Sequence, residues 1–118
     1  MQVLILENSK QITQRLIELI SETIKDITFL KASSYGEALY FLRECNPGVL
    51  LLDLKYPGNS SLELMKKING SVNKPLIIAL SSEVEELNLK QCHEHGVDFI
   101  FDKYADFEKI PNVIRAIL

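Results

Sequence analysis

Short runs of apolar residues alternate along this chain with longer segments in which apolar residues recur every three or four positions. The runs lie at residues 3–6, 27–30, 49–52, 76–80 and 99–101. Runs of this length, bounded by turn residues, predict buried β-strands. The run at 49–52 is apolar at every position, which is typical of a strand covered on both faces in a parallel sheet. The run at 27–30 is less hydrophobic and is expected nearer an edge.

The segments between these runs carry signals for helices. Helix starts are expected at Asn8 or Ser9, at Ser34 with Glu37, at Ser60 with Glu63, and near Glu83 for a polar helix over 83–94. Pro111 fits only in the first turn of a helix, so the last helix should begin near it. The apolar residues expected to face the core from these helices are Ile12, Leu16, Leu19, Ile20, Ala38, Leu39, Leu42, Leu62, Met65, Ile68, Leu87, Ile110, Val113, Ile114 and Ile117.

Five strands that alternate with five helices predict a parallel α/β fold with helices on both faces of the sheet. Right-handed crossovers leave few topologies, of which the commonest for this count is the flavodoxin-like (βα)5 three-layer sandwich with strand order 2-1-3-4-5. The chain has 118 residues and contains no repeat, low-complexity segment or linker, so we expect one domain over 1–118.

Composition and charge exclude several classes of protein. The apolar fraction of 47% and the charged fraction of 25% are those of an ordinary globular domain. A formal net charge of −3 argues against nucleic acid or an anionic membrane surface as the partner. The apolar runs are far too short for a membrane span. Met1 leads directly into the first strand, so no secretory signal is expected.

The cysteines and histidines do not predict a metal site. Cys45 and Cys92 are too few for a disulfide framework, and a reducing cytoplasm is the expected setting. His93 and His95 lie two apart and face different ways on a helix. Only Cys92 and His95 share a face, and two ligands do not make a zinc site. We expect a solvated helix end there.

Polar residues follow four of the predicted strands: Glu7 and Asn8 after the first, Asp53 after the third, Ser81 after the fourth and Lys103 after the fifth. In the predicted order these four strands are neighbours, so their carboxyl ends share one rim, where such folds place their ligands. Each residue also has a structural interpretation. Asp53 and Asn8 are turn and cap formers, and Glu7 can form a buried salt bridge with Lys103.

These residue types fit phosphoryl chemistry. Two acids beside an amide attract a hard divalent cation through oxygen ligands. A hydroxyl and an ammonium opposite them can bind the oxygens of a phosphoryl group. Asp53 could then act as the nucleophile and form an acyl phosphate. Asn8 is equally suited to metal binding and to helix capping, so both roles stay open at this point.

The chain resembles the receiver domains of bacterial two-component response regulators along nearly its whole length. Any one matching stretch is a weak motif, but several in order at the proper spacing are specific. The stretches are Val3-Leu4-Ile5-Leu6-Glu7-Asn8, Tyr35-Gly36-Glu37-Ala38-Leu39, Pro47-Gly48-Val49-Leu50-Leu51-Leu52-Asp53, Pro57-Gly58, Ile77-Ile78-Ala79-Leu80-Ser81-Ser82 and Gly96-Val97-Asp98-Phe99-Ile100-Phe101-Asp102-Lys103.

The resemblance implies that Asp53 accepts a phosphoryl group from a phosphohistidine on a sensor histidine kinase or a phosphotransfer protein. It implies that Ser81 contacts the phosphoryl oxygens and that Lys103 bridges to the acyl phosphate. The implied Mg²⁺ ligands are Glu7, Asn8, Asp53 and the backbone carbonyl of Lys55.

Several positions depart from the family's pattern. Asn8 replaces a second acid, so we expect weakened but not abolished Mg²⁺ affinity. The Lys55 side chain should either oppose Mg²⁺ or stabilise the phosphoryl oxygens. Tyr104 stands where relatives have a proline, often in a cis peptide, so this loop should be strained or differently shaped. Ile100 replaces an aromatic ring that reports activation, and Ser61 replaces a glycine.

We therefore expect a phosphoacceptor signalling domain, not a classical enzyme, that switches the binding of a downstream protein partner. The expected switching surface is formed by the fourth helix, the fifth strand and the fifth helix. The alternative is a receiver-like interaction module that works without phosphorylation and has an impaired metal site. A flavin enzyme on the same fold is disfavoured because residues 8–13 lack the glycines of a phosphate cradle. The oligomeric state stays open, as does membership in a longer chain.

Overall fold

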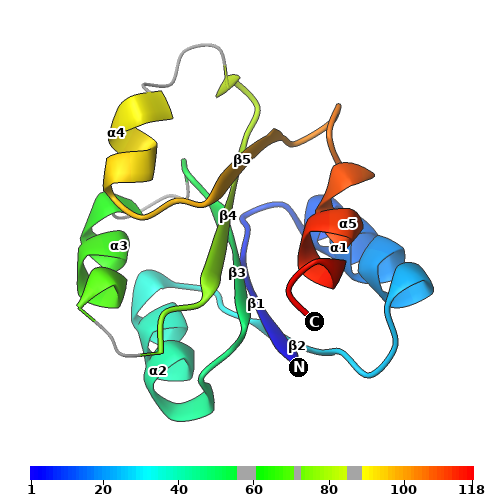
Figure 1. Cartoon of the computed structure of the whole chain (residues 1–118), viewed down its shortest axis with the longest axis horizontal. Helices are drawn as coiled ribbons and strands as arrows, with labels where there is room; N and C mark the ends of the chain where they lie inside the picture. The colour runs from blue at the N-terminus through cyan, green and yellow to red at the C-terminus, as the bar shows by residue number, and fades with distance from the viewer. Residues whose placement is uncertain (56–60, 71–72, 85–88) are drawn as a thin grey trace.

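The computed structural model describes residues 1–55, 61–70, 73–84 and 89–118, with the backbone alone at Leu62. It contains one parallel sheet in the order β2-β1-β3-β4-β5 (Figure 1), which confirms the predicted fold class and order. The strands are β1 (Gln2–Leu6), β2 (Thr28–Lys31), β3 (Val49–Asp53), β4 (Leu76–Ser81) and β5 (Phe99–Asp102). The helices are α1 (Lys10–Thr23), α2 (Tyr35–Cys45), α3 (Ser61–Asn69), α4 (Leu89–Glu94) and α5 (Lys109–Arg115).

The sheet lies between two layers of helices. Figure 1 shows α1 and α5 on one face and α2, α3 and α4 on the other. Every residue of β3 is buried, as its continuous apolar run predicts. The edge strands β2 and β5 are half-exposed along their length. β3 therefore places its last residue, Asp53, at the centre of the carboxyl-end rim.

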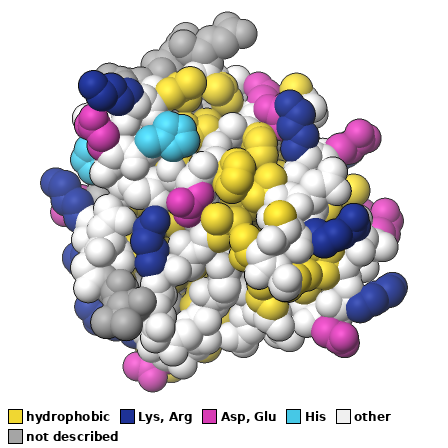
Figure 2. Space-filling model, in the orientation of Figure 1, with side chains coloured by type: hydrophobic (Ala, Val, Ile, Leu, Met, Phe, Trp, Pro, Cys, Tyr) yellow, Lys and Arg dark blue, Asp and Glu magenta, His cyan; other side chains and the backbone are white. Residues whose placement is uncertain are grey.

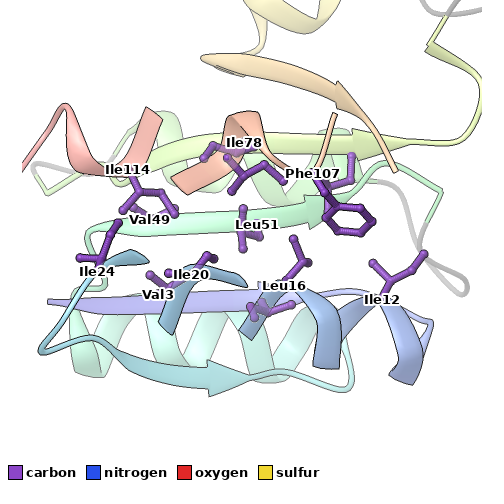
Figure 3. Close-up of a cluster of buried hydrophobic side chains, with 13 residues drawn as sticks. Val3, Ile12, Leu16, Ile20, Ile24, Val49, Leu51, Ile78, Phe107 and Ile114 are labelled. Atoms are coloured by element: carbon purple, nitrogen blue, oxygen red, sulfur yellow. The ribbon is translucent and has the colours of Figure 1, made fainter. Parts of the chain in front are cut away.

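Alternate residues of the central strands serve two separate cores. Leu51 pairs in register with Ile5 on one side and Ile78 on the other, and all three belong to the core that α1 and α5 cover. Figure 3 shows Leu51 and Ile78 within this core. Leu50 and Leu52 face the opposite core, under α2 and α3. Each such leucine contributes about 1.5–3 kcal/mol through its burial. A register slip of one residue would exchange the two sets, so the packing fixes which strand ends meet at the rim.

Local hydrogen bonds set the helix starts. Ser9 Oγ accepts a hydrogen bond from the Ile12 N–H at 3.2 Å, so Ser9, and not Asn8, caps α1. Ser34 Oγ accepts from the Glu37 N–H at 3.0 Å, as predicted. The Glu37 carboxylate accepts from the Ser33 N–H at 2.8 Å, one residue earlier than a standard capping box requires.

Some expectations for the last two helices are wrong. Glu83 is not helical, and the described part of α4 begins only at Leu89. Ile117 follows the end of α5 and is 44% exposed, because that helix is only two turns long. Pro111 lies in its first turn, as expected. The predictions for Pro57, Gly58, Ser60 and Leu87, and for the side chain of Leu62, lie outside the described residues.

The segment around Cys92 agrees with a structural role. His93 Nδ1 lies 2.8 Å from the Val97 carbonyl oxygen, and His95 Nδ1 lies 2.7 Å from the Gln91 carbonyl oxygen. Burial raises the pKa of the Cys92 thiol.

Among the helices of the described residues, none combines the length and the hydrophobicity that crossing a membrane requires.

Candidate functional site

The candidate site lies where the carboxyl ends of β1, β3, β4 and β5 meet. Glu7 directly follows β1, Asp53 ends β3, Ser81 ends β4 and Lys103 directly follows β5. The Lys103 N–H donates to the Ser81 carbonyl oxygen at 3.0 Å, which extends the pairing of β4 with β5 by one residue. The strand order therefore brings these residues to one rim, as their positions in the sequence predict.

Glu7, Asp53 and Lys103 form a buried ionic triad. Lys103 Nζ lies 2.8 Å from Glu7 Oε1 and 3.0 Å from Asp53 Oδ2. The side chains are 12% exposed for Lys103, 0% for Glu7 and 5% for Asp53. At this burial an unpaired charge is strongly destabilising, so the single ammonium holds both carboxylates in place. The salt-bridge interpretation of Glu7 is thus realised in the structure.

The remaining triad oxygens are partly satisfied by backbone. Glu7 Oε2 accepts a hydrogen bond from the Ser9 N–H at 2.7 Å, and Asp53 Oδ1 accepts one from the Lys55 N–H at 2.9 Å. Apart from its ion pair with Lys103, the buried Glu7 Oε1 has no well-aligned hydrogen bond to any described residue. Burial acts to lower the pKa of Lys103, but hydrogen bonds to Glu7 and then Asp53 outweigh it, so this pKa lies above its ordinary value.

Asn8 lies beside the triad without joining it. Its side chain is exposed, and its place as a helix cap is taken by Ser9. Together with Glu7 it lines a cleft of about 480 Å³ between the starts of α1 and α2. The exposed Asn8 side chain is therefore accessible beside a buried carboxylate.

Ser81 is buried at the end of β4. Its Oγ accepts a hydrogen bond from the Glu83 N–H at 3.0 Å. The Glu83 carboxylate forms a salt bridge with Lys55 Nζ, and the two side chains are 47% and 54% exposed. We call Lys55 and Glu83 the entrance pair. It joins the loop after β3 to the loop after β4.

The sequence predictions missed Glu83 as a neighbour of the site because they placed it in a helix. A usable signal was present in the spacing. Lys55 lies two residues after Asp53, and Glu83 lies two residues after Ser81, on adjacent strands. Opposite charges at matching offsets from neighbouring strand ends are expected to pair.

The positions that depart from the expected pattern have definite places. The Ser61 hydroxyl donates to the Leu54 carbonyl oxygen at 3.2 Å and so ties the start of α3 to the loop after β3. Ile100 packs into the core under α2 and α3. Phe99 and Phe101 stack on the opposite face of β5, with ring centroids 6.0 Å apart. Tyr104 is 70% exposed, and its peptide bond to Lys103 is trans.

The donor set at this rim suits a hard divalent cation. Two buried carboxylates lie within contact distance of the same ammonium, and a neutral amide is next to them. The described residues contain no cluster of three or more His, Cys, Asp or Glu side chains that could hold a metal ion. Any ion here would thus be held by two acids and by neutral oxygens.

Comparison with known proteins assigns the family. Residues 3–115 match the family model described as the response regulator receiver domain. The chain is 27% identical over 120 residues to the sensory transduction protein LytT of Oceanobacillus iheyensis, covering 98% of this chain and 48% of that protein. It is also 27% identical over 120 residues to the transcriptional regulatory protein BaeR of Escherichia coli O6:H1, covering 94% of this chain and 45% of that protein. The chain thus spans about half the length of these curated relatives.

Solved structures agree on the fold. The signal receiver domain of a DNA-binding response regulator (merR) from Colwellia psychrerythraea superimposes with a TM-score of 0.88 at 19% identity, over 98% of this chain and 96% of that one. The receiver domain of the Francisella response regulator 1452 gives a TM-score of 0.84 at 21% identity, over 98% and 94% of the two chains. With the family match over nearly its whole length, the chain belongs to the response regulator receiver domain family, a family of signalling domains.

Proposed function

We propose that this chain is a phosphoacceptor receiver domain that is phosphorylated on Asp53 in the presence of Mg²⁺. The donor would be a phosphohistidine on a sensor histidine kinase or on a phosphotransfer protein. The observation that carries the proposal is the ionic triad, in which Lys103 Nζ lies within 3.0 Å of Asp53 and 2.8 Å of Glu7. A nucleophilic carboxylate, a second acid and an ammonium are the groups that this transfer requires.

In the proposed step, a carboxylate oxygen of Asp53 attacks the phosphorus of the phosphohistidine. The new O–P bond forms as the P–N bond breaks, and the imidazole leaves with the electron pair. Lys103 would stabilise the charge on the phosphoryl oxygens, a role that is supported by the hydrogen-bond distance between its ammonium and Asp53. The buried Ser81 hydroxyl, oriented by the Glu83 N–H, would contact another phosphoryl oxygen.

The residues that would hold Mg²⁺ are the carboxylates of Glu7 and Asp53, the amide oxygen of Asn8 and the backbone carbonyl of Lys55. The buried Glu7 Oε1 supports this set, because apart from its ion pair with Lys103 it accepts no hydrogen bond from another described residue. When bound, the ion would neutralise charge on the phosphoryl oxygens. We expect its affinity to be lowered, because Asn8 supplies an oxygen without a charge.

The proposed output surface is the face formed by α4, β5 and α5. Figure 2 shows hydrophobic side chains gathered on the surface between α4 and α5. Large apolar side chains with substantial exposure in these elements and the segments next to them are Leu89, Phe99, Tyr104, Ile117 and Leu118. Exposed apolar groups of this kind support a protein partner as the reader of the switch. Ile100 packs into the core and has no aromatic ring that could report activation. In this proposal, phosphorylation therefore changes the α4–β5–α5 face through residues other than Ile100.

One observation favours a second candidate, an interaction module that works without phosphorylation. Lys103 already pairs with both carboxylates, so the triad is satisfied without phosphate or metal. Asn8 further reduces the charge that would attract Mg²⁺. In this case the fold would present the α4–β5–α5 face permanently, and Asp53 would be a structural residue.

Acetyl phosphate with Mg²⁺, or a phosphorylated kinase, tests the first candidate. We expect the wild-type chain to gain a phosphate that hydroxylamine removes, and the Asp53→Asn variant to gain none. Removing Mg²⁺ with a chelator should stop the reaction in the wild type. A wild-type chain that behaves like Asp53→Asn with both donors contradicts the proposal.

Beryllofluoride separates the two candidates. If Asp53 is a phosphoacceptor, beryllofluoride with Mg²⁺ should shift the amide NMR signals of the strand ends and of β5 in the wild type only. The second candidate expects no shift, and a partner affinity that is equal for wild type and Asp53→Asn. A partner that loses affinity for Asp53→Asn would exclude the second candidate.

A further inference from the structure

The loop between β5 and α5 is closed by two aspartates, Asp102 at the end of β5 and Asp106 within the loop. Asp102 Oδ1 accepts hydrogen bonds from the Tyr104 N–H at 2.8 Å and from the Ala105 N–H at 2.9 Å. Asp106 Oδ2 accepts from the Asp102 N–H at 2.9 Å. We call Asp102 and Asp106 the carboxylate brace. Lys103, the cation of the triad, lies between them in the sequence.

Every backbone N–H from residue 102 to residue 106 has a partner. Besides the three bonds to the brace, the Lys103 N–H donates to the Ser81 carbonyl oxygen at 3.0 Å, and the Asp106 N–H donates to the Asp102 carbonyl oxygen at 3.3 Å. The backbone on both sides of Lys103 is therefore held by hydrogen bonds. The bond to Tyr104 depends on an N–H that a proline at this position would lack.

The far end of the loop is anchored as well. Phe107 is buried, and the Arg15 guanidinium of α1 lies 5.1 Å from the centre of its ring. Asp106 Oδ1 lies 2.9 Å from Lys109 Nζ. The Asp102 N–H, and then Lys109, hold the pKa of Asp106 below its ordinary value, so this carboxylate is charged near neutral pH.

The triad needs this rigidity because a lysine side chain is long and flexible. Its ammonium can lie 2.8 and 3.0 Å from two carboxylates only if the backbone at residue 103 is held at a fixed position relative to them. We propose that Asp102 and Asp106 are positioning residues, which fix the backbone so that the Lys103 ammonium is delivered to Glu7 and Asp53. The consequence for phosphorylation rests on the proposed function, whereas the consequence for the triad does not.

The test uses Asp102→Ala, which removes the acceptor of two N–H groups, and Asp102→Asn, which keeps an acceptor oxygen without the charge. Asp106→Ala removes the acceptor of a single backbone N–H group, and it takes the place of Asp102→Ala in the test if Asp102→Ala does not fold. Asp26→Asn is the control for charge, because Asp26 is exposed in the turn before β2, at the opposite end of the strands. Each protein is compared with the wild type by thermal unfolding, by amide hydrogen exchange at 104 and 105, and by the NMR signal of the Lys103 ammonium.

We expect Asp102→Ala to speed amide exchange at 104 and 105 and to broaden the Lys103 ammonium signal beyond detection. Beryllofluoride binding with Mg²⁺ should weaken roughly ten- to hundredfold, because small displacements of a catalytic group have effects of that order. Asp102→Asn should restore most of the affinity, and Asp26→Asn should match the wild type. Asp106→Ala should act in the same direction with a smaller effect.

The positioning role of the carboxylate brace is refuted if Asp102→Ala or Asp106→Ala unfolds at lower temperature while the Lys103 ammonium signal and the beryllofluoride affinity stay as in the wild type. It is also refuted if Asp102→Asn behaves like Asp102→Ala. A wild-type chain that binds no beryllofluoride would refute the proposed function instead. In that case the ammonium signal and the amide exchange still decide whether the brace positions Lys103.

Discussion

Two lysine–glutamate pairs lie around Asp53, and they differ mainly in their exposure to water. Lys103 and Glu7 are 12% and 0% exposed, and Lys103 also contacts Asp53. Lys55 and Glu83, the entrance pair, are 54% and 47% exposed. The Coulomb energy between two charges at contact distance is several times larger in the low-dielectric environment of a protein than in bulk water. The same two residue types therefore have very different energetic roles within one site.

The buried triad determines the shape of the site, and the entrance pair leaves that shape adjustable. Breaking the triad would leave a buried charge unpaired, which is costly, whereas an exposed pair can exchange its partners for water at little cost. The backbone N–H of Lys55 nevertheless bonds Asp53 Oδ1 at 2.9 Å. The backbone around Asp53, the proposed nucleophile, is thus held in place, while the charge of the exposed Lys55 can respond to an incoming anion.

Removing the cation of the triad should have the largest effect on stability. Lys103→Met keeps most of the length of the side chain but leaves Glu7 and Asp53 as two buried carboxylates without a counterion. We expect the free energy of unfolding to fall by about 3 kcal/mol at neutral pH, as measured by urea denaturation.

The matched control is Lys66→Met, which breaks an exposed pair with Glu63 whose side chains are 62% and 59% exposed. Its free energy of unfolding should change by less than about 0.5 kcal/mol. Equal losses in the two variants would show that burial does not distinguish the triad from a surface pair.

Adding an acid beside the triad should have the next largest effect. Asn8→Asp places a second carboxylate next to Glu7, in the exposed position that Asn8 now occupies. We expect about tenfold tighter Mg²⁺ binding in calorimetric titration, because the charge of the ligand set largely sets affinity for hard cations. The effect should diminish as salt increases, because the new charge is exposed.

Asn8→Ala is the control for the amide oxygen itself. If Asn8 is a ligand, this variant should bind Mg²⁺ more weakly than the wild type. An affinity that is equal in the wild type and in both variants would show that residue 8 lies outside the metal site and that exposed charge at this rim has little influence.

The buried part of this comparison could be predicted from the sequence more directly than the exposed part. The apolar run at 49–52 predicts the central strand, and the strand order then brings Glu7, Asp53 and Lys103 to one rim. Such predictions succeed because a strand that is apolar at every position must be covered on both faces, which places it inside a parallel sheet between two layers of helices. The same placement of the strand ends makes a buried salt bridge between Glu7 and Lys103 one of the two interpretations that the sequence supports for Glu7.

Contacts between loops left weaker signals. The sequence predicts a helix that starts near Glu83, but Glu83 precedes the described part of α4 and pairs with Lys55. Asp102 and Asp106 follow the i, i+4 spacing of many surface acids, and only the folded loop shows that both bind backbone N–H groups. Such bonds depend on the tertiary path of a short segment, which propensity and hydrophobic pattern do not determine.

The smallest effect should come from the entrance pair. Lys55→Ala removes a side chain whose charge is mostly in water, so the free energy of unfolding should change by less than about 0.5 kcal/mol. A double-mutant cycle with Glu83→Gln should give a coupling energy of about 0.2–1 kcal/mol that declines with added salt. A coupling as large as the loss in Lys103→Met would mean that the two pairs share one electrostatic environment. The contrast between a fixed interior and an adjustable entrance would then be wrong, and Lys55 would belong with Lys103 among the groups that hold Asp53.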